Sequence, residues 1–171
     1  MAKENIEKTI WASLKAHDLP DTAAAAVMGN LCAESALRPD NMEDQYQKRL
    51  GMTDQSYTAA VDSGTYTNFV HDAVGYGLAQ WTWHSRKLGL LTAAKRQGVS
   101  IGDPDLQMEF LFRELETQWP SLLRSLRDPA VTLYDATARF MKGFENPADQ
   151  SDAAVAGRVQ LAQIYYNRYH R

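Results

Sequence analysis

The sequence predicts an all-α protein that folds as one domain. Apolar residues recur at spacings of three and four through most of the chain, and no stretch alternates convincingly with a period of two. The chain has 171 residues, of which 44% are hydrophobic and 23% charged, enough for a single domain with a sizeable core. No repeat or low-complexity tract divides it, so we expect one domain over residues 1–171.

Charge and hydropathy exclude several classes of function. Lysine and arginine number 18 against 21 acidic residues, so a formal net charge of -3 gives no bulk reason to expect nucleic acid as a partner. No apolar run approaches the length of a membrane span, and the polar start Met1–Asn5 does not resemble a signal peptide. We therefore expect neither a membrane partner nor a signal peptide.

Cysteine and histidine give no sign of a metal or redox site. Cys32 is the single cysteine, which excludes an intrachain disulfide, and its apolar neighbours on a predicted helix favour a small core residue. The four histidines are scattered and lack metal-ligand spacing. We expect no metal and no cofactor.

Two helices are predicted before residue 40. The first covers about residues 3 to 17, where apolar side chains recur every three or four positions. The second begins with Asp21 as its N-cap and is ended by Arg38-Pro39, because a residue before proline disfavours helical backbone.

Glu34 lies at an unusual position on the second helix. It falls seven residues after Val27 and three after Leu31, on the apolar stripe that these residues define. A carboxylate facing the interior is costly unless paired, and desolvation favours its protonated form. Glu34 is therefore a candidate proton donor near neutral pH. The alternative is an ordinary last-turn glutamate that points to solvent or pairs with Arg38.

A polar excursion follows over about residues 40–74, with short helices expected at residues 42–50 and 53–62. After it the chain is helical to its end. The further helices are expected at about residues 85–97, 105–118, 121–126, 131–143 and 151–168.

An aromatic and glycine-rich segment, Gly75–Trp83, separates the excursion from these helices. Tyr76, Trp81 and Trp83 stand beside Gln80, a composition suited to a sugar site, since aromatic faces pack on pyranose C–H groups and amides bond hydroxyls. We expect these four side chains to bind substrate. The alternative for each ring is packing in the core.

Motifs in a fixed order resemble those of known proteins. Ala33-Glu34-Ser35 at a helix end, followed by Gly77-Leu78-Ala79-Gln80, resembles the lysozyme-like superfamily, although Ala79 stands where methionine is usual. With Gly29–Pro39, Tyr57–Asp62, Gly75–Thr82 and Phe144–Asp149, the chain from about residue 20 to its end looks like the phage tail-type lysozyme family.

The resemblance implies a lysozyme-like helical domain with a substrate cleft. It would cleave the β-1,4 bond between N-acetylmuramic acid and N-acetylglucosamine in peptidoglycan. Such cleavage needs a carboxylic acid that stays protonated near neutral pH, and the resemblance assigns this role to Glu34. Ser35, the next residue, would bind the substrate beside Glu34. We expect a monomer acting on the cell wall, from a phage tail, a phage-encoded lysin or a secreted hydrolase.

The identity of a second carboxylate is left open by the resemblance. Goose-type lysozymes, a more distant likeness, keep acids near the equivalent glycine segment, where this chain has His71 and Thr82. Asp72, one residue from the first place, is one candidate for orienting a water. Glu145 is the other, with binding of backbone amides at a helix end as its alternative role.

Three functions compete on this evidence. The first is a hydrolase of the muramidase type. The second is a lytic transglycosylase, which uses the same acid without a catalytic water and forms 1,6-anhydro products. The third is a non-catalytic glycan-binding or phage structural module, against which the retained Glu34-Ser35 pair argues.

Overall fold

The structure is a computed structural model that describes residues 3–170. Within this range the chain forms α-helices and no sheet, which confirms the predicted all-α class. The helices are α1 (Lys3–Ala16), α2 (Asp21–Ser35), α3 (Asp44–Leu50), α4 (Asp54–Asp62), α5 (His84–Gln97), α6 (Pro104–Gln118), α7 (Pro120–Leu126), α8 (Leu133–Phe140) and α9 (Asp152–Tyr169), with a π-helical turn η1 (Met141–Glu145) after α8. None of the helices in the described part is long and apolar enough to cross a membrane.

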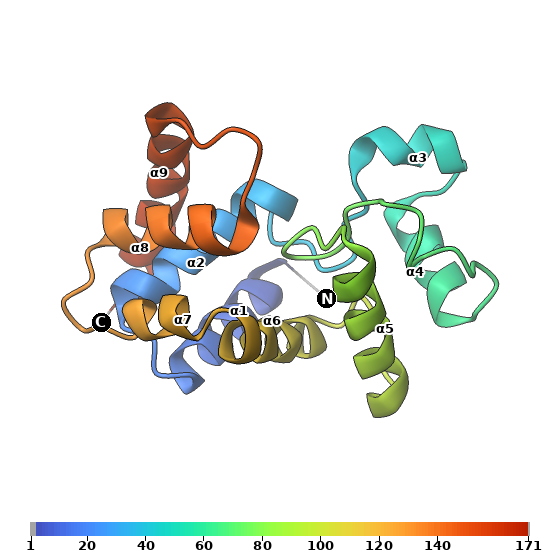
Figure 1. Cartoon of the computed structure of the whole chain (residues 1–171), viewed down its shortest axis with the longest axis horizontal. Helices are drawn as coiled ribbons and strands as arrows, with labels where there is room; N and C mark the ends of the chain where they lie inside the picture. Colours follow the sequence, from blue (N-terminus) through green and yellow to red (C-terminus); the bar gives the residue numbers. More distant parts are fainter. Residues whose placement is uncertain (1–2, 171) are drawn as a thin grey trace.

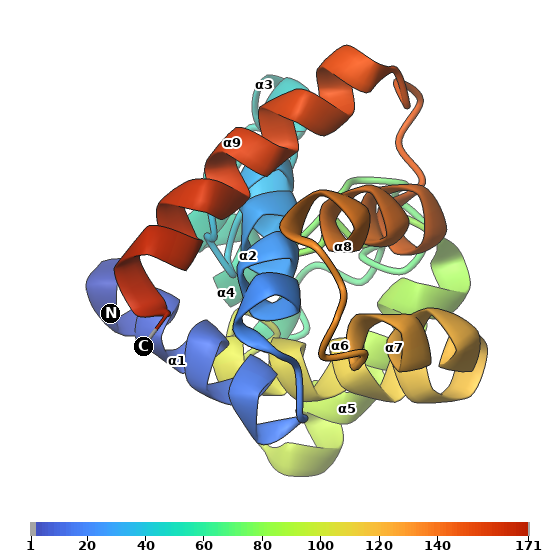
Figure 2. The same cartoon turned by 90° about the vertical axis from the view of Figure 1, so that its left-hand side faces the viewer.

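Helix α2 lies at the centre of the molecule, with α9 across it and α1 and α8 beside it (Figure 2). All residues from Ala23 to Leu31 are buried, so the helix is covered on every side rather than along one stripe. Its run of alanines lets neighbouring helices approach closely. At Gly29 the approach is closest, because an added Cβ would lie 2.6 Å from the backbone nitrogen of Ala162 in α9.

Both ends of α2 differ from the prediction. Pro20 occupies the N-cap position and makes no side-chain cap, so the prediction of Asp21 as N-cap was wrong. Asp21 is instead the first helical residue and pairs with Lys15 at 2.6 Å. At the other end the helix stops at Ser35, since Ala36 adopts left-handed backbone with φ 54°.

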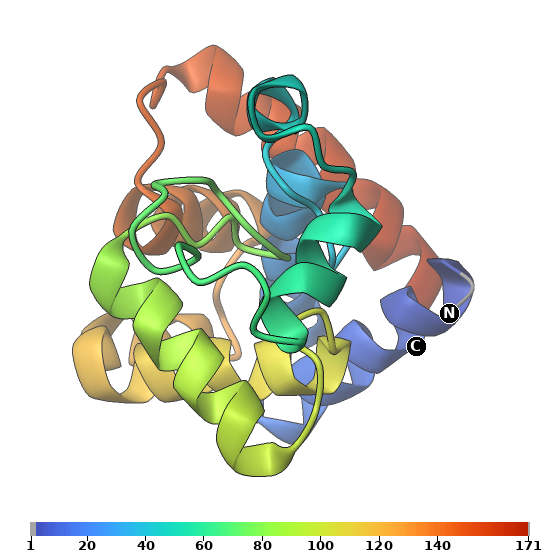
Figure 3. The same cartoon turned by 90° about the vertical axis from the view of Figure 1, so that its right-hand side faces the viewer.

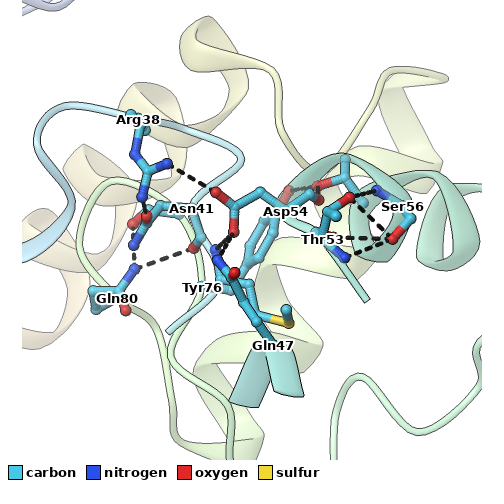
Figure 4. A network of polar contacts seen from close by, with 11 residues as sticks. Arg38, Asn41, Gln47, Thr53, Asp54, Ser56, Tyr76 and Gln80 are labelled. Atoms are coloured by element: carbon cyan, nitrogen blue, oxygen red, sulfur yellow. Dashed lines mark hydrogen bonds and ion pairs between the residues drawn. The ribbon is translucent and has the colours of Figure 1, made fainter. Parts of the chain in front are cut away.

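Helices α3, α4 and α5 and the connecting loops form the other side of the molecule (Figures 1 and 3). The two short helices expected between residues 40 and 74 are present as α3 and α4. Asp54 joins them to the end of α2, because its carboxylate accepts from Arg38 at 2.9 Å and from Gln47 and the Met42 amide at 3.1 Å (Figure 4). This network fixes the loop that follows α2.

Residues 75–83 form an irregular loop between the two sides. Gly77 needs its positive φ of 77°, and a Cβ there would lie 2.7 Å from the side chain of Gln107. Gln107 is fully buried on α6; its Oε1 accepts from the Leu78 amide at 2.8 Å, and its Nε2 donates to the Pro39 carbonyl at 2.6 Å. One amide side chain therefore ties this loop to the segment after α2.

Candidate active site

A cavity of about 450 Å³ opens where the end of α2, the residue 75–83 loop, the start of α5 and η1 meet. It brings together segments that are far apart in the sequence. Four charged side chains and several polar ones surround it. The lining residues are Glu34, Glu43, Gly75, Ala79, Gln80, Thr82, Trp83, Arg86, Glu145 and Asn146.

Glu34 lies in the last turn of α2 and reaches the cavity with 20% of its side chain exposed. Its Oε1 accepts from Nη2 of Arg158, on α9, at 2.5 Å. Pairing with Arg38 was the alternative considered from the sequence, but Arg38 pairs with Asp54. Glu34 is therefore a partly buried carboxylate with one strong cationic partner.

Ser35 connects the two motifs that carry the resemblance. Its hydroxyl is buried and lies 3.0 Å from the Leu31 carbonyl and 2.9 Å from the Leu78 carbonyl, so it bonds within α2 and to the loop. It is not among the cavity-lining residues. In this structure Ser35 positions the loop beside Glu34 rather than facing the cavity.

Glu145 is the last residue of η1 and lines the same cavity as Glu34. Although the residue keeps some exposed surface, its Oε1 atom is buried and has no hydrogen-bond partner. Burial raises the pKa of this carboxyl well above its usual value, and the charge on Glu34 raises it further, against the opposing effect of Arg86 and Arg158. Burial therefore favours the protonated form of Glu145.

Asp72 does not line this cavity. Its carboxylate pairs with Lys87 at 2.5 Å and accepts from the hydroxyls of Tyr57 at 2.6 Å and Tyr66 at 3.0 Å. Lys87 is fully buried, and burial lowers its pKa. Asp72 thus balances a buried cation, and the structure does not bring it to Glu34 as the second carboxylate expected from the sequence.

Two of the three aromatic rings expected at a sugar site are core residues. Tyr76 and Trp81 are 0% exposed and do not line the cavity. The Tyr76 hydroxyl lies 2.7 Å from that of Thr58, and Trp81 Nε1 donates to Glu114 at 2.8 Å. A ring without exposed surface cannot stack on a sugar, so the expected platform is reduced to Trp83, which is 75% exposed and lines the cavity.

Gln80 lines the cavity and also holds its wall together. Its backbone is left-handed with φ 47°, which is uncommon for a residue with a side chain. Its Nε2 donates to the carbonyls of Asn41 at 3.2 Å and Gly77 at 3.1 Å (Figure 4). A Cβ at Gly75 would lie 2.7 Å from Gln80 Oε1, so a larger residue there would displace the Gln80 side chain.

Three charged residues of the site, Glu43, Arg86 and Arg158, were not predicted from the sequence. Arg86 forms a two-pronged ion pair with Glu114, with both hydrogen bonds 2.8 Å long. Arg158 had a usable signal, because it lies on the buried face of its helix, four residues before Ala162. The argument that singled out Glu34 applies equally to it.

Among residues 3–170 no group of three histidine, cysteine or acidic side chains lies close enough to hold a metal ion. In a comparison with known families, residues 5–169, nearly the whole chain, match the family described as phage tail lysozyme. No curated protein matches the chain.

Proposed function

The chain belongs to the phage tail lysozyme family, and we propose that it is an N-acetylmuramidase that hydrolyses the β-1,4 bond between N-acetylmuramic acid and N-acetylglucosamine. Family membership itself indicates a lysozyme-like action on peptidoglycan and a phage or cell-wall setting. The proposal adds the bond cleaved, the use of water and the residues that act.

One observation carries the proposal: the carboxyl groups of Glu34 and Glu145 line the same cavity. Glycoside hydrolysis needs one carboxyl group to protonate the leaving oxygen and a second to activate water or stabilise positive charge. Burial and the neighbouring charge of Glu34 favour the protonated form of Glu145, so we propose that the pair holds one proton in the working enzyme. An acid and a base are thereby available together.

We assign the general acid to Glu34 and the base to Glu145. In the free site Glu34 is paired with Arg158, and we place the proton on Glu145, whose protonated form is favoured by burial. When glycan binds, this proton moves to Glu34, which gives it to the glycosidic oxygen as the bond to the muramic acid C1 breaks. A water then attacks C1 and passes its proton to Glu145.

This cycle is balanced, because each turnover consumes one water and returns the carboxyl pair to its starting state. Direct attack by water implies inversion at C1. Trp83, exposed at the rim, and Gln80 are proposed to hold the sugar rings. Tyr76 and Trp81 support the wall from within the core, and Asp72 is no longer proposed as the second carboxylate.

The test is mass spectrometry of purified peptidoglycan digested by the protein. Hydrolysis predicts reducing N-acetylmuramic acid ends. Products lighter by one water, with 1,6-anhydro ends, would establish a transglycosylase, and no released fragments would establish a binding module. Glu34→Gln should lower the rate at least about 10²-fold with the fold intact. Glu116→Gln, on the exposed face of α6, is the matched control and should leave the rate unchanged.

A further inference from the structure

We propose that Arg158 is a positioning residue that holds the catalytic carboxyl pair in a resting state, with the charge on Glu34 and the proton on Glu145. The inference rests on the proposed function and adds a means of regulation to the same site. Arg158 would have to release Glu34 when a glycan enters, so that the proton can move to the general acid.

The contacts of Arg158 support this role. Its Nη2 donates to Glu34 Oε1 at 2.5 Å, while its Nη1 donates to the Asn30 side chain at 3.3 Å and to the Asn30 carbonyl at 3.4 Å. The Arg158 side chain is 11% exposed. Because Nη1 and Nη2 are both hydrogen-bonded and the side chain is largely buried, the guanidinium has a fixed orientation toward Glu34.

Asn30 is itself fixed, which makes it a rigid support. It is fully buried in α2, and its Nδ2 donates to the carbonyls of Ala26 at 2.9 Å and Thr137, on α8, at 3.2 Å. Both amide hydrogens are thus engaged, and Oδ1 is left to accept from Arg158. Three helices therefore contribute to the position of one arginine.

The register of α9 against α2 completes the arrangement. Ala162 lies one helical turn after Arg158 on the same face of α9, and its backbone packs on Gly29, one residue before Asn30. Any side chain larger than hydrogen at Gly29 would push α9 away. The close helix crossing consequently determines that Arg158 lies opposite Glu34.

The other charged groups facing this pair are Glu43 and Arg86 on the cavity wall and Glu114 behind Arg86. Arg86 is held by both oxygens of Glu114, so its charge is largely compensated. Arg158 is the cation in direct contact with Glu34. The negative charge of Glu34 is the second cause, after burial, of the raised pKa of Glu145, and the direct effect of Arg158 on that carboxyl opposes it.

The first experiment compares pH profiles of kcat/KM on cell walls. Without the positive charge the carboxyl pair should keep its last proton to higher pH, because an opposite charge at contact shifts a titration by about 1 to 3 units. Arg158→Gln should therefore move the alkaline midpoint up by about one pH unit or more. Arg158→Lys retains the charge and should stay near the parent.

Arg168→Gln is the matched control, since Arg168 lies on the same helix and pairs with Glu7, which is not a cavity residue. Its pH profile should equal that of the parent. An unchanged alkaline midpoint in Arg158→Gln, at any level of activity, would overturn the inference, because a purely structural role lowers the rate without moving the midpoint.

A second measurement needs no activity, and its readout is the titration of the parent protein itself. Carboxyl ¹³C NMR of the parent, with glutamate labelled and signals assigned through Glu34→Gln and Glu145→Gln, should show Glu145 keeping its proton to higher pH than Glu34. The reverse order would refute the resting state. A parent without wall cleavage would instead refute the proposed function, whatever the titration order.

Discussion

Exposure distinguishes the aromatic residues of the Gly75–Trp83 segment from one another. From the sequence, Tyr76, Trp81 and Trp83 are equally good candidates for sugar binding, because each is an aromatic residue near glycines and an amide. In the folded chain Tyr76 and Trp81 have no exposed surface, whereas Trp83 is 75% exposed at the cavity. A single ring therefore remains to contact a glycan from this segment.

Trp83→Ala should weaken binding of N-acetylglucosamine oligomers by about two- to twelvefold, as expected for the loss of about 0.5 to 1.5 kcal/mol of aromatic contact. Titration calorimetry with the inactive Glu34→Gln background would measure it. Tyr134→Ala is the control, since Tyr134 is 50% exposed on α8 and does not line the cavity. Equal affinities for both variants would remove Trp83 from the site.

At the scale of elements, the crossing of α2 and α9 is the contact on which the site depends. Gly29 allows it, because an added Cβ would lie 2.6 Å from the Ala162 nitrogen and 2.8 Å from its Cα, distances at which backbone must move. Gly157 lies in α9, the helix that carries Ala162, and an added Cβ there would meet no atom within 4 Å. The two glycines thus make a matched pair.

Gly29→Ala should lower the free energy of unfolding by about 1 to 3 kcal/mol, the usual cost of overpacking a core. Gly157→Ala should leave it unchanged or raise it by about 0.5 to 1 kcal/mol, because alanine loses less entropy in a helix. Urea denaturation of the two variants and the parent measures both changes. If Gly29→Ala is as stable as the parent, α2 and α9 do not pack in close contact at Gly29.

The ion pair of Asp72 and Lys87 acts on another element, the loop before residue 75. Lys87 Nζ also donates to the Val74 carbonyl at 2.7 Å and lies 4.3 Å from the centre of the Phe69 ring. These contacts attach the loop to α5. Asp72 therefore affects the cavity through the position of its wall.

Asp72→Asn should lower the free energy of unfolding by about 3 to 5 kcal/mol, because it leaves a buried ammonium without its counter-charge. Combining Asp72→Asn with Lys87→Met should recover much of this loss, since the double variant has no unpaired charge. Denaturation of the single and double variants measures the coupling. A single variant that stays stable but loses kcat would restore Asp72 as a catalytic candidate.

At the scale of the whole molecule, one buried acid makes stability depend on pH. The pKa of Glu145 is raised in the folded state by burial and by Glu34, so folding favours its protonated form. The contribution of protonated Glu145 to the free energy of unfolding is fully present below the pKa of the unfolded state, near 4.5. It is lost as the pH rises toward the higher pKa of the folded state. The Glu145 carboxyl group therefore lowers the free energy of unfolding as the pH rises above its unfolded value.

Glu145→Gln should be more stable than the parent at pH 8, and the difference should shrink toward pH 4, because the amide cannot ionise. Each unit of raised pKa corresponds to about 1.4 kcal/mol. Urea denaturation at both pH values measures the difference, and equal stability at both would contradict the buried acid. Coincident transitions by circular dichroism and tryptophan fluorescence would support the prediction that the chain is one domain.

The sequence by itself determined the helices and one acid of the site. Helical periodicity and end signals are local, so the bounds of α5, α6 and α9 fall within about one residue of those expected. Glu34 was found in the same way, from its position relative to Val27 and Leu31. Its partner on α9 lies 124 residues away, and no local pattern pairs the two.

Tertiary structure alone decided which side chains share the cavity. Periodicity shows that a residue faces inward but not what it meets there, which depends on how helices cross and which loops cover them. It therefore could not separate buried Trp81 from exposed Trp83, or Asp72 beside Lys87 from Glu145 beside Glu34. Burial and pairing are properties of the assembled core, because solvent is excluded from a carboxyl group only once its neighbours are in place.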